Sequence, residues 1–187
     1  MKEQIIISGF GGQGVLFVGK LLAYAGMMAG KYVSWIPSYG PEMRGGTANC
    51  SVTISDKEIT SPIVNQCTAL LALNEPSVDK FFPQVTRGGK VFLNGSIIKK
   101  EKPQEGELLW FSIPAQELAE EIGKSSLMNM VILGAFLKHT SIITLEDIKI
   151  GMKEMIGDKK PDLIEQNIRA IEKGMGMTDQ EVNYNYA

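Results

Sequence analysis

Two kinds of hydrophobic spacing alternate along the chain. Short continuous apolar runs, typical of strands covered on both faces, occur at residues 5–7, 69–73, 91–93 (directly after Lys90) and 109–111, and a further strand is expected at 32–35. Segments with helical spacing lie at residues 15–29, 115–122 and 127–137, and others begin at residues 74, 144 and 161. Strands that alternate with helices in this way predict an α/β fold with a largely parallel sheet.

One segment departs from this pattern, because residues 47–54 alternate strictly between apolar and small polar side chains. That period is typical of a strand with one buried face. Residues 55–57 then favour a turn, so we expect residues 58–62 to return as an antiparallel hairpin partner. The predicted fold class is a three-layer α/β/α, Rossmann-like architecture with a mixed, mostly parallel sheet and this antiparallel hairpin.

The expected helices carry recognisable end signals. Asn74 is a predicted N-cap, residues 144–147 resemble a capping box, and Pro161 suits the first turn of the last helix. Ser125 and Ser126 are the expected caps of the helix at residues 127–137.

The length and net charge of the chain limit the classes of protein to which it can belong. With 187 residues the chain is long enough for one well-buried domain and short for two, so residues 1–177 are expected to form a single α/β domain. Residues 178–187 are a polar tail with too little apolar surface to fold alone, and we expect the tail to be either disordered or laid over a partner. A net charge of −2 without a long basic run gives no indication of nucleic-acid binding. The chain contains no signal-peptide pattern and no run that could span a membrane, so a cytoplasmic protein is the expectation.

Side chains that carry catalysis are scarce. The chain has only two cysteines, Cys50 and Cys67, and both are predicted to be reduced and buried. Four thiolates normally hold an iron–sulfur cluster and four ligands a structural zinc ion, so this chain alone is expected to hold neither. The sole histidine, His139, follows an apolar helix and is expected to cap its C-terminus.

The most distinctive stretch follows the first apolar run, where four of the six residues from Gly9 to Gly14 are glycine. A strand, a glycine turn and an apolar helix in succession present backbone N–H groups to an anion. Gly9, Gly11 and Gly14 satisfy the dinucleotide spacing, but that site also needs an acidic residue after the second strand, where Ile36 and Pro37 stand. Three alternatives remain: a nicotinamide or flavin site, a turn that serves only strand–helix packing, and a surface for an anionic ligand or a partner.

A second shaped loop spans residues 37–46 and contains Tyr39, Glu42 and Arg44. Its prolines and glycines exclude a helix or a central strand. Arg44 could present its planar guanidinium to a carboxylate or phosphate, or could pair with Glu42 on the surface. If the strands run parallel, this loop and the glycine loop share the sheet edge where ligands of α/β proteins bind, together with residues 74–76 and 94–96.

Two further features leave alternatives open. The helix at residues 15–29 is almost entirely apolar, which indicates either burial under the sheet and a neighbouring helix or a subunit interface. Asn129 is the polar side chain in the first turns of another apolar helix, where it is expected to bond a nearby backbone group rather than a ligand.

Three stretches taken together resemble the gamma subunit of 2-oxoacid:ferredoxin oxidoreductases, and within that family the 2-oxoglutarate branch. They are Gly9-Phe10-Gly11-Gly12-Gln13-Gly14-Val15, Ser38-Tyr39-Gly40-Pro41-Glu42-Met43-Arg44-Gly45-Gly46 and Asn129-Met130-Val131-Ile132-Leu133-Gly134-Ala135-Phe136. The resemblance implies an α/β/α subunit, inactive alone, of an enzyme of anaerobic metabolism that converts 2-oxoglutarate, or a related acid such as pyruvate, to its acyl-coenzyme A and CO2.

The resemblance also implies the partners and cofactors. Alpha and beta subunits would hold thiamine diphosphate and Mg²⁺, [4Fe–4S] clusters would lie on the beta or a ferredoxin-like subunit, and ferredoxin would accept the electrons. This chain would bind no cofactor alone but could contact coenzyme A. The implied contact surface, with no catalytic and no metal-binding residue, consists of Gly11, Gly12, Gln13, Gly14, Tyr39, Arg44, Gly45 and Gly46.

Other classes of protein remain as alternatives to a non-catalytic subunit. One is a self-sufficient nucleotide-binding Rossmann-like oxidoreductase, and another is a nucleotide-binding regulatory module. The missing ribose-binding acid and the scarce catalytic side chains favour the subunit. Its apolar helices also predict that the isolated chain self-associates.

Overall fold

The structure is a computed structural model that describes residues 1–38, 47–101, 103, 107–157 and 160–177. Its strands are β1 (Lys2–Phe10), β2 (Tyr32–Ser38), β3 (Thr47–Ser55), β4 (Cys67–Ala72), β5 (Val85–Asn94) and β6 (Leu109–Ile113). Its helices are α1 (Val15–Met28), α2 (Glu75–Phe81), α3 (Ala115–Glu121), α4 (Met128–Lys138), α5 (Leu145–Ile156) and α6 (Pro161–Met175), with short 3-10 turns η2 (Phe82–Gln84) and η3 (Ser125–Leu127).

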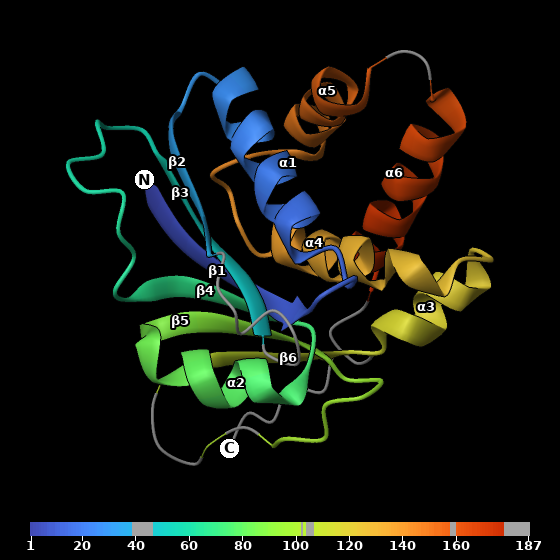
Figure 1. The fold of residues 1–187 in the computed structure, drawn as a ribbon, viewed down its shortest axis with the longest axis horizontal. Coiled ribbons are helices and arrows are strands. Elements are labelled where there is room, and N and C mark those ends of the chain that lie inside the picture. The colour runs from blue at the N-terminus through green and yellow to red at the C-terminus, as the bar shows by residue number, and fades with distance from the viewer. Residues whose placement is uncertain (39–46, 102, 104–106, 158–159, 178–187) are drawn as a thin grey trace.

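The described strands form one mixed sheet in the order β2-β3-β1-β4-β5-β6. Strands β1, β4, β5 and β6 are parallel neighbours, whereas β3 is antiparallel to both β1 and β2. Helices α1, α3, α4, α5 and α6 lie on one face of this sheet, and α2 lies on the other face, over β4 and β5 (Figure 1). The predicted three-layer α/β/α class with a mixed, mostly parallel sheet is confirmed.

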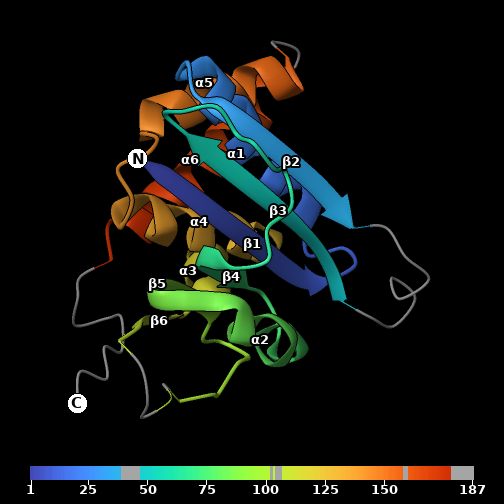
Figure 2. The same ribbon diagram turned by 90° about the vertical axis from the view of Figure 1, so that its left-hand side faces the viewer.

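The partner of the alternating segment was predicted wrongly. Residues 58–62 form no strand, and β3 instead lies between β1 and β2 (Figure 2). Each edge of β3 is paired along its length, from Lys2–Ser55 to Phe10–Thr47 on one side and from Tyr32–Ser55 to Ser38–Asn49 on the other. No free edge remains for a third strand, so the antiparallel hairpin is formed by β2 and β3.

Helix α1 is buried by its own chain, which favours the first of the two alternatives left open for it. Val18, Leu21, Leu22 and Ala25 are at most 1% exposed beneath the sheet and α5. Helix α5 approaches α1 closely through Gly151, where an added Cβ would lie 2.7 Å from the backbone nitrogen of Ala25.

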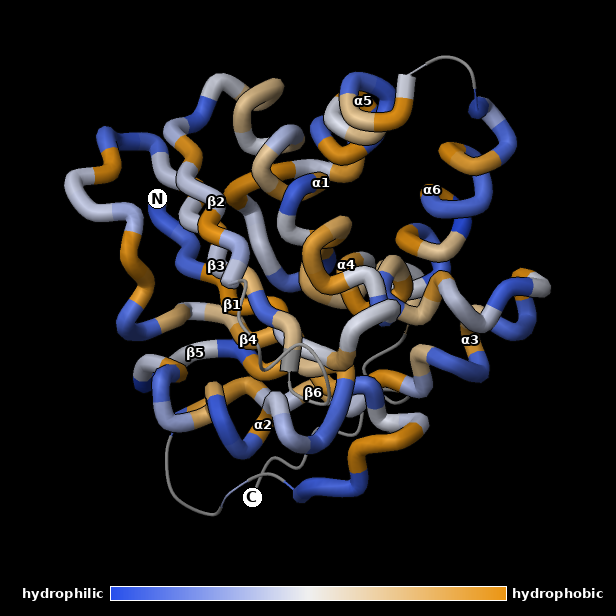
Figure 3. The backbone as a smooth tube through the Cα atoms, viewed as in Figure 1, coloured by the Kyte–Doolittle hydropathy of each residue, from blue (hydrophilic) through white to orange (hydrophobic). Residues whose placement is uncertain are grey.

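Helices α4 and α6 cross at two glycines, Gly134 and Gly174. A Cβ added to Gly134 would lie 2.0 Å from the carbonyl oxygen of Ile171, and one added to Gly174 would lie 2.0 Å from that of Val131. Helix α4 is apolar over most of its length (Figure 3) and every residue from Asn129 to Leu137 is buried. The glycine contact therefore brings two helix backbones together around the centre of the core.

The predicted helix ends were confirmed at Asn74, at residues 144–147 and at Pro161, which begins α6, and were wrong at Ser125 and Ser126. Asn74 accepts a hydrogen bond from the Ser77 N–H at 2.9 Å, and Thr144 forms a capping box with Asp147. Ser125 and Ser126 do not cap α4, because they belong to η3, which leads directly into the helix. None of the described helices is long and apolar enough to cross a membrane.

Candidate functional site

The carboxyl ends of five strands meet at one edge of the sheet. Strands β1 and β2 point the same way because both are antiparallel to β3 (Figure 2), and β4, β5 and β6 run parallel to β1. Phe10 is paired with Thr47, and Ser38 with Asn49. Ser38 and Thr47, the described residues on either side of 39–46, therefore lie at this edge. The predicted site residues Tyr39, Arg44, Gly45 and Gly46 lie outside the described residues.

The order of the sheet changes direction between β1 and β4. The chain leaves β1 through α1 on one face toward β2, and leaves β4 through α2 on the other face toward β5 (Figure 1). Such a switch point separates the two following helices and opens a crevice at the carboxyl edge of the strands, where α/β proteins bind their ligands. The segments at this switch point are Gly9–Gly14 and Leu73–Asn74.

The glycine loop has the backbone that its sequence predicts. Gly12 and Gly14 adopt φ values of 89° and 77°, and Gly11 and Gly12 are exposed. An added Cβ at Gly12 would meet no described atom within 4 Å. Gly14 is the N-cap of α1 without a side-chain hydrogen bond, and the first turn of that helix contains no acidic residue. The loop thus presents exposed backbone at the positive end of a helix dipole, an arrangement that suits an anion.

The half-buried Gln13 ties the loop to the sheet. Its Oε1 accepts a hydrogen bond from the Phe10 N–H at 2.6 Å, and its Nε2 donates to the Leu73 carbonyl at 3.3 Å. The backbone N–H of Gln13 also donates to the Phe10 carbonyl at 3.2 Å. Sequence reasoning placed Gln13 in the site but gave no signal of its partner Leu73, which is 60 residues further along the chain.

Asn129, in the first turn of α4, packs against the glycine loop at Gly14. Its Oδ1 accepts a hydrogen bond from the Met130 N–H at 2.9 Å, as expected for a buried amide that satisfies nearby backbone. Its Nδ2 lies so close to Gly14 that a Cβ there would be 2.1 Å away. The first turn of α4 therefore packs closely against the loop that precedes α1.

Two more asparagines end neighbouring strands at this edge. Asn74 follows β4 and Asn94 ends β5, and each is at most 1% exposed. Within the described part of the chain, the Nδ2 of Asn74 and the Oδ1 of Asn94 have no hydrogen-bond partner. Buried polar atoms usually have hydrogen-bond partners. The two amides therefore add incompletely bonded polar groups at the ends of the central strands.

The cysteines do not form a reactive or ligand-binding pair. Cys50 and Cys67 are free and belong to the hydrophobic clusters on opposite faces of the sheet. Burial raises the pKa of each thiol to about 12. Among the residues that the structure describes, no three or more His, Cys, Asp and Glu side chains gather as a metal site.

Both thiols should therefore resist alkylation in the folded chain. Iodoacetamide reacts with the thiolate, and a thiol with a pKa of about 12 is almost wholly protonated at pH 8. Mass spectrometry should detect no adduct at Cys50 or Cys67 under native conditions and two adducts after denaturation in guanidinium. A rapid native adduct would contradict the buried placement of the modified cysteine.

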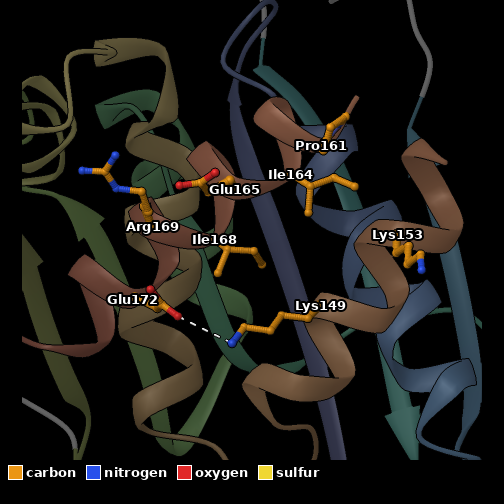
Figure 4. A pocket seen from close by; sticks show the side chains of 8 residues that line it. All are labelled: Lys149, Lys153, Pro161, Ile164, Glu165, Ile168, Arg169 and Glu172. Atoms are coloured by element: carbon orange, nitrogen blue, oxygen red, sulfur yellow. Dashed lines mark ion pairs between the residues drawn. The ribbon is translucent and has the colours of Figure 1, made fainter. Parts of the chain in front are cut away.

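A groove away from the predicted residues lies between α5 and α6. It has a volume of about 610 Å³, and Ile164 and Ile168 lie between charged side chains of the two helices (Figure 4). Lys149 and Glu172 form an ion pair across it at 3.6 Å. The groove contains none of the predicted site residues, so the glycine loop remains the candidate site.

The fold and the site define a class: an α/β domain with an exposed glycine loop at the switch point of its sheet. Among the described residues, no cluster of side chains could hold a metal ion. The sequence pattern of the pyruvate ferredoxin/flavodoxin oxidoreductase family matches residues 4–177. The chain belongs to this family.

Related subunits exist both as separate chains of similar length and as longer chains. The chain is 34% identical over 177 residues to the 2-oxoglutarate synthase subunit KorC of Methanocaldococcus jannaschii, covering 93% of this chain and 92% of KorC. It is 36% identical over 174 residues to the ketoisovalerate oxidoreductase subunit VorA of Methanothermobacter thermautotrophicus, covering 92% of this chain but only 36% of VorA. The chain thus spans about a third of the length of that relative.

Solved structures agree with the fold. The gamma subunit of a keto/oxoacid ferredoxin oxidoreductase from Geobacter sulfurreducens superposes with a TM-score of 0.77 at 30% identity, covering 92% of this chain and 95% of that subunit. A 2-oxoglutarate:ferredoxin oxidoreductase from Magnetococcus marinus, solved with 2-oxoglutarate, coenzyme A and succinyl-CoA, gives a TM-score of 0.82 at 22% identity over 93% of this chain and 30% of that one. The chain has the fold of gamma subunits of 2-oxoacid oxidoreductases over almost all of its length.

Proposed function

We propose that this chain is the gamma subunit of a 2-oxoglutarate:ferredoxin oxidoreductase. The assembled enzyme would convert 2-oxoglutarate and coenzyme A to succinyl-CoA and CO2 and would pass two electrons to ferredoxin. The observation that carries the proposal is the match in length with KorC, a separate 2-oxoglutarate synthase subunit of which 92% is covered. Partners would be alpha and beta subunits and a ferredoxin-like subunit.

The proposed role of this chain in the complex follows from the side chains that it contains. Thiamine diphosphate, on the partner subunits, would supply the decarboxylation chemistry. The free cysteines Cys50 and Cys67 lie on opposite faces of the sheet, so the described residues do not fit an iron–sulfur cluster. This chain would instead cover the active site with its carboxyl edge.

The surface proposed to face coenzyme A consists of both loops at that edge: Gly11, Gly12, Gln13, Gly14, Tyr39, Arg44, Gly45 and Gly46. The exposed backbone at Gly11 and Gly12 and the uncapped start of α1 suit a diphosphate, and Arg44 would supply a charged partner. The Magnetococcus marinus enzyme, which shares the fold, binds coenzyme A and succinyl-CoA.

A 2-ketoisovalerate enzyme is the second candidate, because VorA of Methanothermobacter marburgensis is 40% identical over 136 residues. The two candidates differ in substrate, and purification of the native complex separates them. The chain would be tagged in its host, purified without oxygen and assayed with coenzyme A, a viologen acceptor and 2-oxoglutarate, 2-ketoisovalerate or pyruvate. Co-purification of thiamine-binding and iron–sulfur chains with preference for 2-oxoglutarate supports the proposal; a lone nucleotide-binding chain would overturn it.

Placing a carboxylate in the glycine loop should weaken coenzyme A binding in the assembled complex. Gly12→Asp puts a negative charge where a phosphate is proposed, in open space on the described surface. We expect the KM for coenzyme A to rise by about tenfold or more, with the KM for 2-oxoglutarate nearly unchanged. Gly30→Asp is the matched control, since Gly30 has a similar φ of 69° and equally open surroundings. Equal KM values for the two variants would refute contact between the loop and coenzyme A.

A further inference from the structure

The pairing of β1 with β4 ends in an unusual way at the switch point. The two strands are in parallel register from Ile5–Ala69 to Ser8–Ala72, and the Leu73 N–H still donates to the Ser8 carbonyl at 2.8 Å. In a parallel ladder, the carbonyl of the same residue normally accepts the next bond from the neighbouring strand. Here that donor would be the Phe10 N–H.

The carboxamide of Gln13 stands in place of this bond. Phe10 N–H donates to Gln13 Oε1 at 2.6 Å, and Gln13 Nε2 donates to the Leu73 carbonyl at 3.3 Å. A primary amide has the same donor and acceptor as a peptide group, so it can be inserted between the two backbones while satisfying both. The side-chain amide thereby bridges Phe10 and Leu73, just beyond the last residues at which the two strands pair directly.

Gly9 provides the space for this insertion. A Cβ at Gly9 would lie 2.7 Å from Gln13 Oε1 and 2.9 Å from the Cβ of Leu73. Any side chain there would compete with the amide for the same position. Gly9 and Gln13 therefore act as a pair, in which the first leaves the space and the second fills it.

We propose that Gln13 is a positioning residue, which replaces the last β1–β4 hydrogen bond with its side-chain amide and so fixes Gly11 and Gly12 for the phosphates of coenzyme A. This inference rests on the proposed function of the glycine loop. Gln13 contacts the backbone of Phe10 and Leu73, and it acts on the ligand only through the loop. Without its amide, the Phe10 N–H and the Leu73 carbonyl lose these hydrogen bonds, and the loop loosens.

The test replaces Gln13 with methionine, which has a similar length but cannot reproduce the two hydrogen bonds. In the assembled complex, Gln13→Met should raise the KM for coenzyme A about tenfold, as expected when preorganisation by about two hydrogen bonds is lost, while kcat at saturating coenzyme A changes less than about twofold. Gln66→Met is the matched control, because Gln66 is exposed and precedes β4 at the opposite end of that strand.

A second measurement keeps the proposal testable if the variant complex assembles poorly. Hydrogen–deuterium exchange on the full chain should show a protected Phe10 amide in the unmodified protein, and faster exchange of this amide in Gln13→Met, because the Phe10 N–H donates to the Gln13 side chain. Unchanged exchange of the Phe10 amide, or a KM for coenzyme A equal to that of the Gln66→Met control, would overturn the proposal. If Gly12→Asp raises this KM and Gln13→Met does not, only the positioning role fails; if neither does, the proposed coenzyme A surface fails with it.

Discussion

Replacing Gly134 with alanine should destabilise the chain strongly, because it adds a methyl group where α4 and α6 cross. The added Cβ would lie 2.0 Å from the Ile171 carbonyl oxygen and 3.0 Å from the Met175 backbone nitrogen, both on α6. Backbone atoms cannot rotate away as the end of a flexible side chain can, so α4 and α6 would have to separate in the middle of the core. We expect a loss of about 3 kcal/mol or more of unfolding free energy.

The reciprocal change should behave in the same way. Gly174→Ala places its Cβ 2.0 Å from the Val131 carbonyl oxygen on α4, so a loss of similar size is expected, with a fall in Tm of roughly 10 °C for either variant. Gly176→Ala is the control, because its Cβ would approach described atoms no closer than 3.3 Å. Melting of Gly134→Ala or Gly174→Ala within a degree or two of the control would show that the two helices are further apart than described.

The second large effect is expected at Gly14→Ala. Two costs combine there: a φ of 77°, which an L-residue adopts at a cost of about 1 kcal/mol, and a clash of the added Cβ with Asn129 Nδ2 at 2.1 Å. Moving the Asn129 side chain breaks its hydrogen bond to the Met130 N–H. We expect a total loss of about 3 kcal/mol of unfolding free energy, measured by urea denaturation.

A double variant separates these two costs. Gly14→Ala combined with Asn129→Ala removes the clash but keeps the φ, so it should cost about 1 kcal/mol less than the sum of the single variants. Gly30→Ala, with a φ of 69° and no described atom within 4 Å of its Cβ, reports the backbone cost alone. Strict additivity of Gly14→Ala and Asn129→Ala would mean that the Asn129 side chain does not pack against Gly14.

Much of the fold could be predicted because local signals agree with tertiary packing. The helix predicted at residues 15–29 is α1 at Val15–Met28, and the cap at Asn74 is present with the predicted geometry. Strand β2 extends to Ser38 through Pro37, which an edge strand tolerates because one side of its backbone is unpaired. Periodicity and end signals are properties of neighbouring residues, and a single sequence displays them directly.

The partner of a strand is not such a property. Residues 58–62 follow β3 closely, which suggested a hairpin, but β1 offers nine residues in continuous register with β3 and buries their shared apolar face. Those long-range contacts determine the pairing. The register of β1 with β3 depends on residues about 40 to 50 positions apart, and no local pattern encodes that separation.

In the candidate site, too, local features could be predicted from the sequence, whereas long-range contacts could not. The glycine spacing predicts the positive φ values of Gly12 and Gly14 and an exposed loop before α1. The contacts of Gln13 with Leu73 and of Asn129 with Gly14 join segments far apart in sequence, so neither could be read from the loop alone. The proposed roles of Tyr39, Arg44, Gly45 and Gly46 rest on the sequence, since these residues lie outside the described part of the chain.

The direction of β1 has a consequence for how this subunit can be joined to others. Lys2 and the glycine loop are at opposite ends of a nine-residue strand, which places them about 30 Å apart. A polypeptide attached ahead of Met1 would emerge beside Ser55 and Asp56, at the sheet edge remote from the loop. Gene fusion or an N-terminal affinity tag should therefore leave the crevice accessible, and the same folding unit can serve as a separate chain or as a segment of a longer one.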